Sequence, residues 1–118
     1  MRFSSVFVTI ALVCVATATI AAPCDDVLAN DRLIQCLGDE YAKVDADLNK
    51  TYSALRRRLD QGTKETLKAA QVAWLTYRDK DCELRAGAVA GGQAYQPTFV
   101  SCQTEKTLQR TKELKEFR

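Results

Sequence analysis

The chain has 118 residues, with 17 Lys and Arg, 15 Asp and Glu and no His, and its formal net charge is +2 at pH 7. A charge so close to zero does not suggest a nucleic-acid-binding protein. Without His, the common pairs of nucleophile and base are missing, so we expect no enzyme activity and no cofactor. Carboxylates are plentiful, so a hydrolase that uses surface carboxylates stays as a weaker hypothesis.

The first 22 residues have the pattern of a secretory signal peptide. Arg2 gives a positive start, and an apolar stretch covers residues 6–18. We place the cleavage after Ala21, or else after Ala22, so the mature domain would be residues 23–118. The expected location is the periplasm or the outside of the cell, with no stable insertion in the membrane after cleavage.

A lipoprotein anchor at Cys24 is disfavoured. Pro23 stands directly before this cysteine, where a lipobox has Gly, Ala or Ser. The mature chain is therefore expected to be free of lipid.

Four cysteines remain after cleavage at this site: Cys24, Cys36, Cys82 and Cys102. An even number of cysteines in a short exported domain indicates two disulfides and an oxidising compartment. The chain has neither a CxxC pair nor any His, so we expect no metal site.

The first predicted helix runs from about Asp31 to Asp60. Gly62 is predicted to end it in a left-handed conformation, and Thr63 is predicted to cap the next helix. The apolar face of the first helix recurs every three or four positions and consists of Leu37, Tyr41, Val44, Leu48, Tyr52, Leu55 and Leu59.

The second predicted helix covers about Lys64 to Ala86. Its predicted apolar stripe is Leu67, Ala70, Trp74, Tyr77 and Leu84, with Gln71, Leu75, Arg78 and Cys82 beside it.

The segment AGAVAGGQAYQP, residues 86–97, is rich in glycine and reads as a flexible loop. A third, less apolar helix is predicted from about Thr98 to Phe117. No stretch alternates in the manner of a strand. The expected fold is all-α: a disulfide-stapled helical hairpin plus a third helix, forming one small three-helix unit.

If the first two helices form an antiparallel hairpin about Gly62, residues equally distant from it should face each other. The motif residues that would meet in this way are Asp45, Asn49 and Tyr52 with Arg78, Trp74 and Gln71. Arg110, counted from the glycine loop, lies level with Trp74. We interpret this group as a structural network that sets helix register. The alternative is direct contact with a partner.

The same counting predicts the disulfides. Cys82 and Cys102 are equally far from Gly92, so they form the best pair. Cys36 is out of register with Cys82 by roughly 9 Å at the helical rise, which leaves Cys24 to pair with Cys36. The connectivity of Cys24 with Cys82 and Cys36 with Cys102 remains an alternative.

Several stretches together resemble the LprI-type lysozyme-inhibitor family of exported bacterial proteins. They are DADLNKTYSAL (45–55), AQVAWLTYRDKDC (70–82), GGQAY in the loop, Cys102 and TLQRTKEL (107–114). The resemblance implies a small helical domain with cysteines, in the cell envelope or outside it, that binds lysozyme and protects peptidoglycan. The alternative is an envelope interaction or stress-tolerance module with a different partner.

A lysozyme-binding surface could combine acidic residues for encounter with a loop that plugs the cleft of the enzyme. Asp39 and Glu40, with Asp25 and Asp26, are candidates for the first role. The loop candidates are Gly91, Gly92, Gln93, Ala94 and Tyr95. The alternative is that this loop only joins two helices.

Overall fold

A computed structural model of the chain describes Cys24, Val27 and residues 30–89 and 92–118. The helices are α1 (Asn30–Arg58), α2 (Gln61–Ala88), the short 3-10 helix η1 (Gly92–Ala94) and α3 (Tyr95–Glu116). The described residues contain no strand, which confirms the all-α prediction. The predicted signal peptide, residues 1–22, lies outside the described residues.

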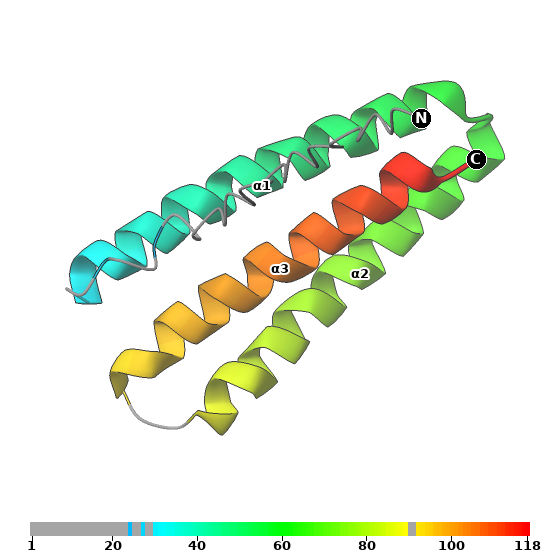
Figure 1. Ribbon diagram of the computed structural model, residues 1–118. Helices are drawn as coiled ribbons and strands as arrows, with labels where there is room; N and C mark the ends of the chain where they lie inside the picture. Colours follow the sequence, from blue (N-terminus) through cyan, green and yellow to red (C-terminus); the bar gives the residue numbers. More distant parts are fainter. Residues whose placement is uncertain (1–23, 25–26, 28–29, 90–91) are drawn as a thin grey trace, which may run out of the picture.

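The three long helices run up, down and up again, as Figure 1 shows. The start of α1 and the connection between α2 and α3 lie at one end of the molecule, which we call the loop end. The α1–α2 turn and the C-terminus lie at the opposite end, which we call the turn end.

Helix α3 packs closely on both of the other helices, whereas α1 and α2 make almost no close backbone approach to each other. The predicted hairpin is therefore right in its connection but not in its packing. Only long side chains can span the wider space between α1 and α2.

The α1–α2 turn differs from the prediction. Asp60 caps α2: its carboxylate accepts hydrogen bonds from the Thr63 amide at 3.0 Å and from the Thr63 hydroxyl at 2.6 Å. Gly62 lies inside the first turn of α2, and only Gly92 has a positive φ among the described residues. The predictions for Gly62 and Thr63 were thus wrong, because an Asp three residues before Thr63 makes a better cap.

The predicted apolar face of α1 is turned inward, and Leu48 and Leu55 on it are fully buried. With Leu67 and Leu114 they form the apolar core, against which Tyr52, Leu59 and Trp74 pack.

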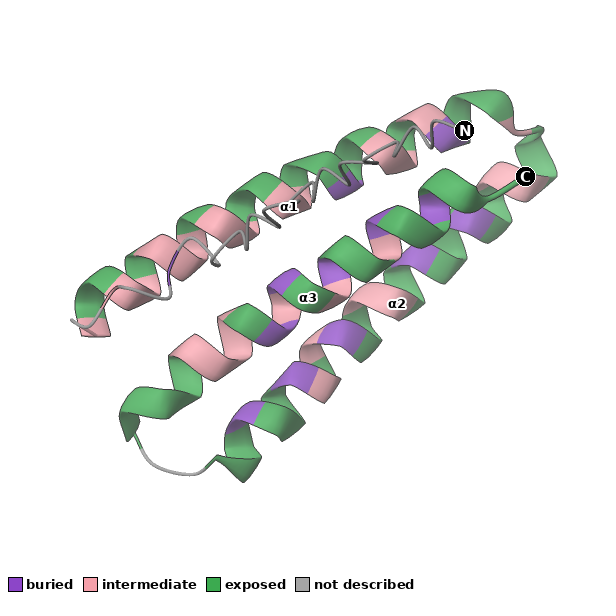
Figure 2. Cartoon of the chain, in the orientation of Figure 1, coloured by how far each residue is buried: buried purple, intermediate pink, exposed green. Residues whose placement is uncertain are grey.

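The predicted apolar stripe of α2 was partly wrong. Tyr77 is 57% exposed and Leu84 is 72% exposed, and Ala70 is also exposed. The buried positions recur along α2 and α3 in Figure 2. Those of α2 are Leu67, Gln71, Arg78, Cys82 and Ala86.

A polar face of α2 can be buried because α3 meets it with hydrogen-bonding side chains. Thr104, Thr107 and Thr111 of α3 are buried, and Thr107 and Thr111 are linked by a 2.8 Å bond from the Thr111 hydroxyl to the Thr107 carbonyl. Among the described residues, no buried side-chain nitrogen or oxygen lacks a partner. Pairing removes most of the cost of burying polar groups.

The two disulfides are Cys24–Cys36 and Cys82–Cys102, with Cα–Cα distances of 5.9 and 5.6 Å. This confirms the predicted connectivity and rejects the alternative. The second disulfide joins α2 to α3 near the loop end.

The connection between α2 and α3 is shorter than predicted, because α2 continues to Ala88 and α3 begins at Tyr95. Pro97 fits in the first turn of α3, where its missing N–H would have no helical partner. None of the helices in the described ranges is both long enough and apolar enough to cross a membrane.

Removing the Cys82–Cys102 bond should destabilise the domain strongly. The bond closes a segment with a sequence separation of 20, so the double variant Cys82→Ala/Cys102→Ala should lose about 3 kcal/mol of unfolding free energy. Urea unfolding followed by circular dichroism measures this loss. Thiol titration of denatured, oxidised protein that consists of residues 23–118 should find no free thiol before the substitution; two free thiols would refute the disulfide assignment.

Candidate functional site

Two of the predicted network residues, Arg78 and Arg110, flank the ring of Trp74. The guanidinium carbon of Arg78 lies 5.3 Å from the centre of the Trp74 ring and 5.6 Å from that of Tyr41. The guanidinium carbon of Arg110 lies 5.8 Å from the Trp74 ring. Planar groups from α1, α2 and α3 thus alternate between aromatic and cationic, an arrangement in which the ring faces attract the cations.

Arg78 is the most buried basic residue of this group, with 5% of its surface exposed. Its Nε donates to Asp79 Oδ1 at 2.9 Å, and its Nη1 donates to the hydroxyl of Thr107 at 3.3 Å. Gln103 of α3 donates to the same Asp79 oxygen at 3.0 Å. A buried guanidinium is tolerated only when its charge and donors are matched, and here a carboxylate, a hydroxyl and two rings match it.

Partial burial alone would raise the pKa of Asp79, but the hydrogen bonds from Arg78 and Gln103 outweigh it, so the pKa of this carboxyl is below its ordinary value. Burial also raises the pKa of Tyr41, although Arg78 acts in the opposite direction.

The cross-hairpin pairs form differently from the prediction. Arg78 pairs with Asp79, its neighbour in sequence, while Asp45 accepts a hydrogen bond from Asn49 at 3.1 Å. No ion pair joins Asp45 to Arg78 in the described part of the chain. The ring of Tyr41 contacts Arg78 from α1 instead.

Gln71 was expected to face Tyr52 of α1, but its hydrogen-bond partner is Arg110 of α3. Its Oε1 accepts a hydrogen bond from Arg110 Nε at 3.1 Å, while Arg110 Nη1 bonds Glu113 at 3.1 Å. Tyr52 packs against the apolar core. The structure thus brings Gln71, Trp74, Arg78 and Arg110 together, with Asp45 and Asn49 at the edge.

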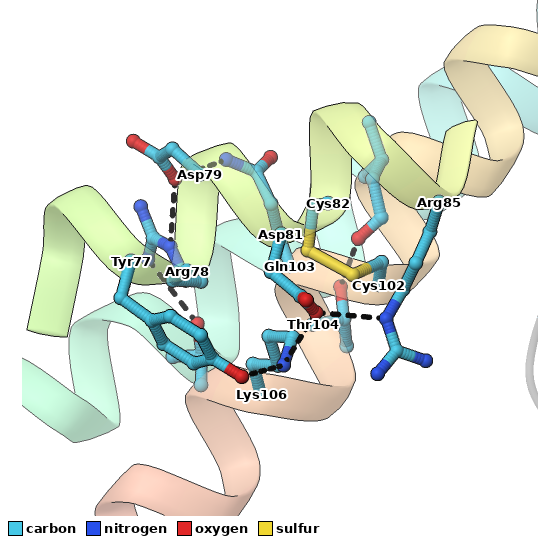
Figure 3. The surroundings of a disulfide bond; sticks show 12 residues. Tyr77, Arg78, Asp79, Asp81, Cys82, Arg85, Cys102, Gln103, Thr104 and Lys106 are labelled. Atoms are coloured by element: carbon cyan, nitrogen blue, oxygen red, sulfur yellow. Dashed lines mark hydrogen bonds and ion pairs between the residues drawn. A yellow bond between two sulfur atoms is a disulfide. The ribbon is translucent and has the colours of Figure 1, made fainter. Parts of the chain in front are cut away.

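A second cluster, missed in the sequence, surrounds the Cys82–Cys102 bond (Figure 3). The Asp81 carboxylate contacts Lys106 and Arg85, each at 2.8 Å. The ammonium of Lys106 also lies 4.8 Å from the centre of the Tyr77 ring. These hydrogen bonds, first from Lys106 and then from Arg85, lower the pKa of Asp81, and the bond to Asp81 raises the pKa of Lys106.

The only signal for this second cluster was the alternation of charge in RDKDCELR, residues 78–85, which by itself names no partner on α3. Thr107, Gln103 and Lys106 were missed for the same reason: their contacts depend on the α2–α3 register.

The candidate partner-binding residues lie at the loop end. Gly92, with φ of 43°, and Gln93 are in η1, whereas Gly91 lies outside the described residues. Tyr95 is the first residue of α3, 37% exposed, and its ring stacks on Phe99 with centroids 6.1 Å apart.

All three helices line a hollow of about 590 Å³ at this end, which we call the loop-end hollow. Leu33 and Leu37 come from α1, Arg85 from α2, Val89 from the C-cap of α2, and Pro97 and Thr98 from α3. Val89 is 47% exposed. The loop end therefore presents apolar surface beside a concave site.

Asp39 and Glu40 line a separate hollow on α1, together with Arg32 and Lys43. The charge of this hollow is thus balanced locally. Asp25 and Asp26 lie outside the described residues.

Replacing Arg78 should lower the unfolding free energy of the domain more than replacing a surface arginine of the same helix does. Arg78→Ala leaves a gap between two rings and removes the partner of Asp79, so we expect a loss of about 3 kcal/mol in unfolding free energy. Arg78→Lys should be intermediate, because an ammonium cannot reproduce the planar fork. Urea unfolding measures both variants.

Arg85→Ala is the matched control, because Arg85 pairs with Asp81 on the surface. Its unfolding midpoint should shift only slightly. Equal destabilisation by Arg78→Ala and Arg85→Ala would contradict the structural importance of the buried arginine.

Acid should destabilise the protein through Asp79 and Asp81. Both have folded-state pKa values below the ordinary 3.8, so their contribution is fully present above that pKa and is lost as the pH falls through the lowered folded-state pKa. The urea midpoint should therefore fall as the pH is lowered below about 4. The Asp79→Asn/Asp81→Asn variant should lose less stability over this interval, and an unchanged pH dependence would count against these two groups.

Comparison with known proteins agrees with the sequence resemblance. A protein of Rhizobium meliloti, described as uncharacterized, is 38% identical over an alignment of 134 positions, which covers 99% of this chain and 96% of the relative. The uncharacterized protein YecT of Escherichia coli is 36% identical over 98 residues, which cover 70% of this chain and 60% of YecT. No solved structure matches. The family model described as lysozyme inhibitor LprI matches residues 24–114, and the chain therefore belongs to the LprI family.

Proposed function

We propose that this protein is exported, binds lysozyme and inhibits it, and so protects peptidoglycan from muramidase attack. The observation that carries the proposal is the match of residues 24–114 to the lysozyme inhibitor LprI model. The two disulfides fit an oxidising compartment outside the cytoplasm. In this proposal the protein acts by binding and not by catalysis.

The motif residues around Trp74 act as a scaffold in this proposal. Arg78 is almost entirely buried, and its Nε and Nη1 donate to Asp79 and Thr107. A side chain with so little exposed surface offers a partner little to contact. Its role would be to hold α1, α2 and α3 in register.

The loop end is our candidate for the surface that contacts lysozyme. Tyr95 and Val89 supply exposed apolar surface there, and Gly92 and Gln93 lie in the turn between them. The Cys82–Cys102 bond fixes the two helices that carry this turn, so less entropy is lost when it is ordered on a partner. A connection at the end of the helices can enter the concave cleft of an enzyme.

The start of α3 also favours a negatively charged partner group. Its N-cap, Ala94, forms no side-chain cap, and the first turn of α3 contains no acidic residue. The positive end of the helix dipole is therefore not neutralised by the side chains of that turn. The cleft of a lysozyme contains two catalytic carboxyl groups, which such a helix end would attract.

Long-range attraction would come from the first half of α1. Asp31, Asp39 and Glu40 there, followed by Asp45, outnumber Arg32 and Lys43, whereas Asp47 lies further along and is paired with Lys115. Lysozymes are typically basic, so an acidic segment close to the loop end would speed their encounter.

A turbidity assay of cell-wall lysis tests both the function and the surface. The oxidised mature protein should slow lysis by lysozyme in proportion to its concentration. Tyr95→Ala should weaken inhibition about tenfold, because an exposed aromatic side chain is a frequent anchor of interfaces. Phe117→Ala, an exposed aromatic residue at the turn end, is the matched control and should inhibit normally.

Unchanged lysis at a large molar excess of the wild-type protein would reject the inhibitor function and favour the alternative of an envelope module with another partner. Normal inhibition by a folded Tyr95→Ala variant would reject only the proposed surface.

A further inference from the structure

The turn end gathers basic side chains that the protein itself leaves unpaired. Seven salt bridges occur among the described residues, and they involve the basic residues of α2 and α3 from Arg78 to Lys115. None of them involves the basic residues around the α1–α2 turn. We call the following unpaired set the basic end: Arg56, Arg57, Arg58, Lys64, Lys68 and Arg118.

The acidic residues nearby are already engaged. Asp60 caps α2 through Thr63, and Glu65 accepts a hydrogen bond from Gln61 at 2.7 Å. Glu113 and Glu116 contact Arg110 and Lys112 of their own helix. The donors to Asp60 and Glu65 are neutral, so these two carboxylates keep their charge, but neither forms a salt bridge with the basic end among the described residues, where the cations outnumber them.

Helix stability explains only part of this charge. The three arginines in the last turn of α1 favour that helix, because cations stabilise the negative end of its dipole. Lys64 lies in the first turn of α2, near the positive end of its dipole, where a cation is unfavourable and where the Asp60 carboxylate at the N-cap offsets part of the cost; Lys68 lies beyond the reach of the dipole. The helix dipole therefore accounts for the arginines of α1 but not for Lys64 and Lys68.

Two hollows at the same end combine charge with apolar surface. One, between α1 and α3, has a volume of about 470 Å³; Lys50 and Arg58 line it, together with Lys115, which is paired with Asp47. The other has a volume of about 310 Å³, and Leu59, Leu67 and Leu114 line it. Phe117 borders this second hollow and is 48% exposed.

We propose that the basic end binds the anionic headgroups of a phospholipid membrane surface, with Phe117 entering the boundary between headgroups and acyl chains. A bilayer offers both features that this end matches: phosphate groups for the unpaired cations and an apolar layer for the aromatic ring. A soluble anionic polymer would match only the charge. Contact would be peripheral, in line with the lack of a membrane-spanning helix in the described ranges.

Charge also separates this surface from the proposed lysozyme-binding one. A basic enzyme would be repelled by the basic end and attracted by the acidic half of α1. The two ends lie at opposite poles of the helices in Figure 1. A molecule held to a membrane by the turn end would present its loop end away from that membrane.

Sedimentation with lipid vesicles tests the proposal. The mature protein should bind vesicles that contain phosphatidylglycerol, and it should bind pure phosphatidylcholine vesicles far more weakly. Each basic residue strengthens binding to an anionic surface about fivefold, so Arg56→Gln/Arg57→Gln/Arg58→Gln should weaken binding on the order of 100-fold. Phe117→Ala should weaken it about fivefold. Salt at about 1 M should abolish most of the binding.

The matched control, Arg32→Gln/Lys43→Gln/Lys80→Gln, removes the same net charge from exposed positions elsewhere and should bind nearly normally. Tyr95→Ala should also bind normally. The proposal would be overturned if the two triple variants lost binding equally or if the protein bound both kinds of vesicle equally. Tighter binding to a single-stranded oligonucleotide than to vesicles would also overturn it. Competition by free glycerol phosphate at equal phosphate concentration would show binding of an isolated phosphate and would also overturn it. The triple arginine variant should still inhibit lysozyme in solution, so failure here leaves the inhibitor function untouched.

Discussion

The burial of Arg78 between the rings of Tyr41 and Trp74 is the constraint on which the rest of the structure depends. A guanidinium with 5% of its surface exposed must have its charge and its donors matched, and the matching groups come from all three helices. Asp79 and Thr107 set the register of α2 against α3. Tyr41 places α1 at the distance that an aromatic ring and a guanidinium together fill. This explains why α1 and α2 are adjacent in sequence and yet barely approach each other.

Because part of the interior is polar, the stability of the loop end depends more on the two disulfides than it would with a larger apolar core. The apolar core consists of four leucines near the turn end, and the loop end is held by the disulfides and by the hydrogen bonds of α2 and α3. Small domains with little apolar core commonly rely on such covalent links. The link between α2 and α3 is also the one nearest the proposed lysozyme-binding turn, so stability and preorganisation of that turn depend on the same bond.

Local signals predicted the helices, both disulfides and the inner face of α1, because these follow from periodicity, cysteine number and distance from a turn. The buried face of α2 was predicted poorly. Apolar periodicity favours Tyr77 and Leu84 for burial, whereas the helix buries Gln71 and Arg78. That choice depends on the threonines of α3, which lie more than 25 positions away in sequence. Asp60 was overlooked as a cap because Thr63 also suits that role, and only the turn geometry distinguishes them. The partner of Arg78 was assigned to Asp45 because counting from Gly62 assumes that α1 and α2 touch.

The distribution of charge follows from the same packing. Where α2 and α3 lie together, Asp79 and Asp81 find cations, and their charges are used within the fold. Toward the turn end, the last arginines of α1 and the first lysines of α2 form no salt bridge among the described residues. The acidic half of α1 lies toward the other end. Charged side chains in the middle of the molecule thus pair with one another, whereas unpaired cations remain at the turn end and acidic residues are in excess in the first half of α1. Such a molecule has a preferred orientation in any field, because a basic enzyme and an anionic membrane attract different ends. An inhibitor that acts at the cell envelope would gain from this polarity, since the end that meets the enzyme stays free when the other end is held.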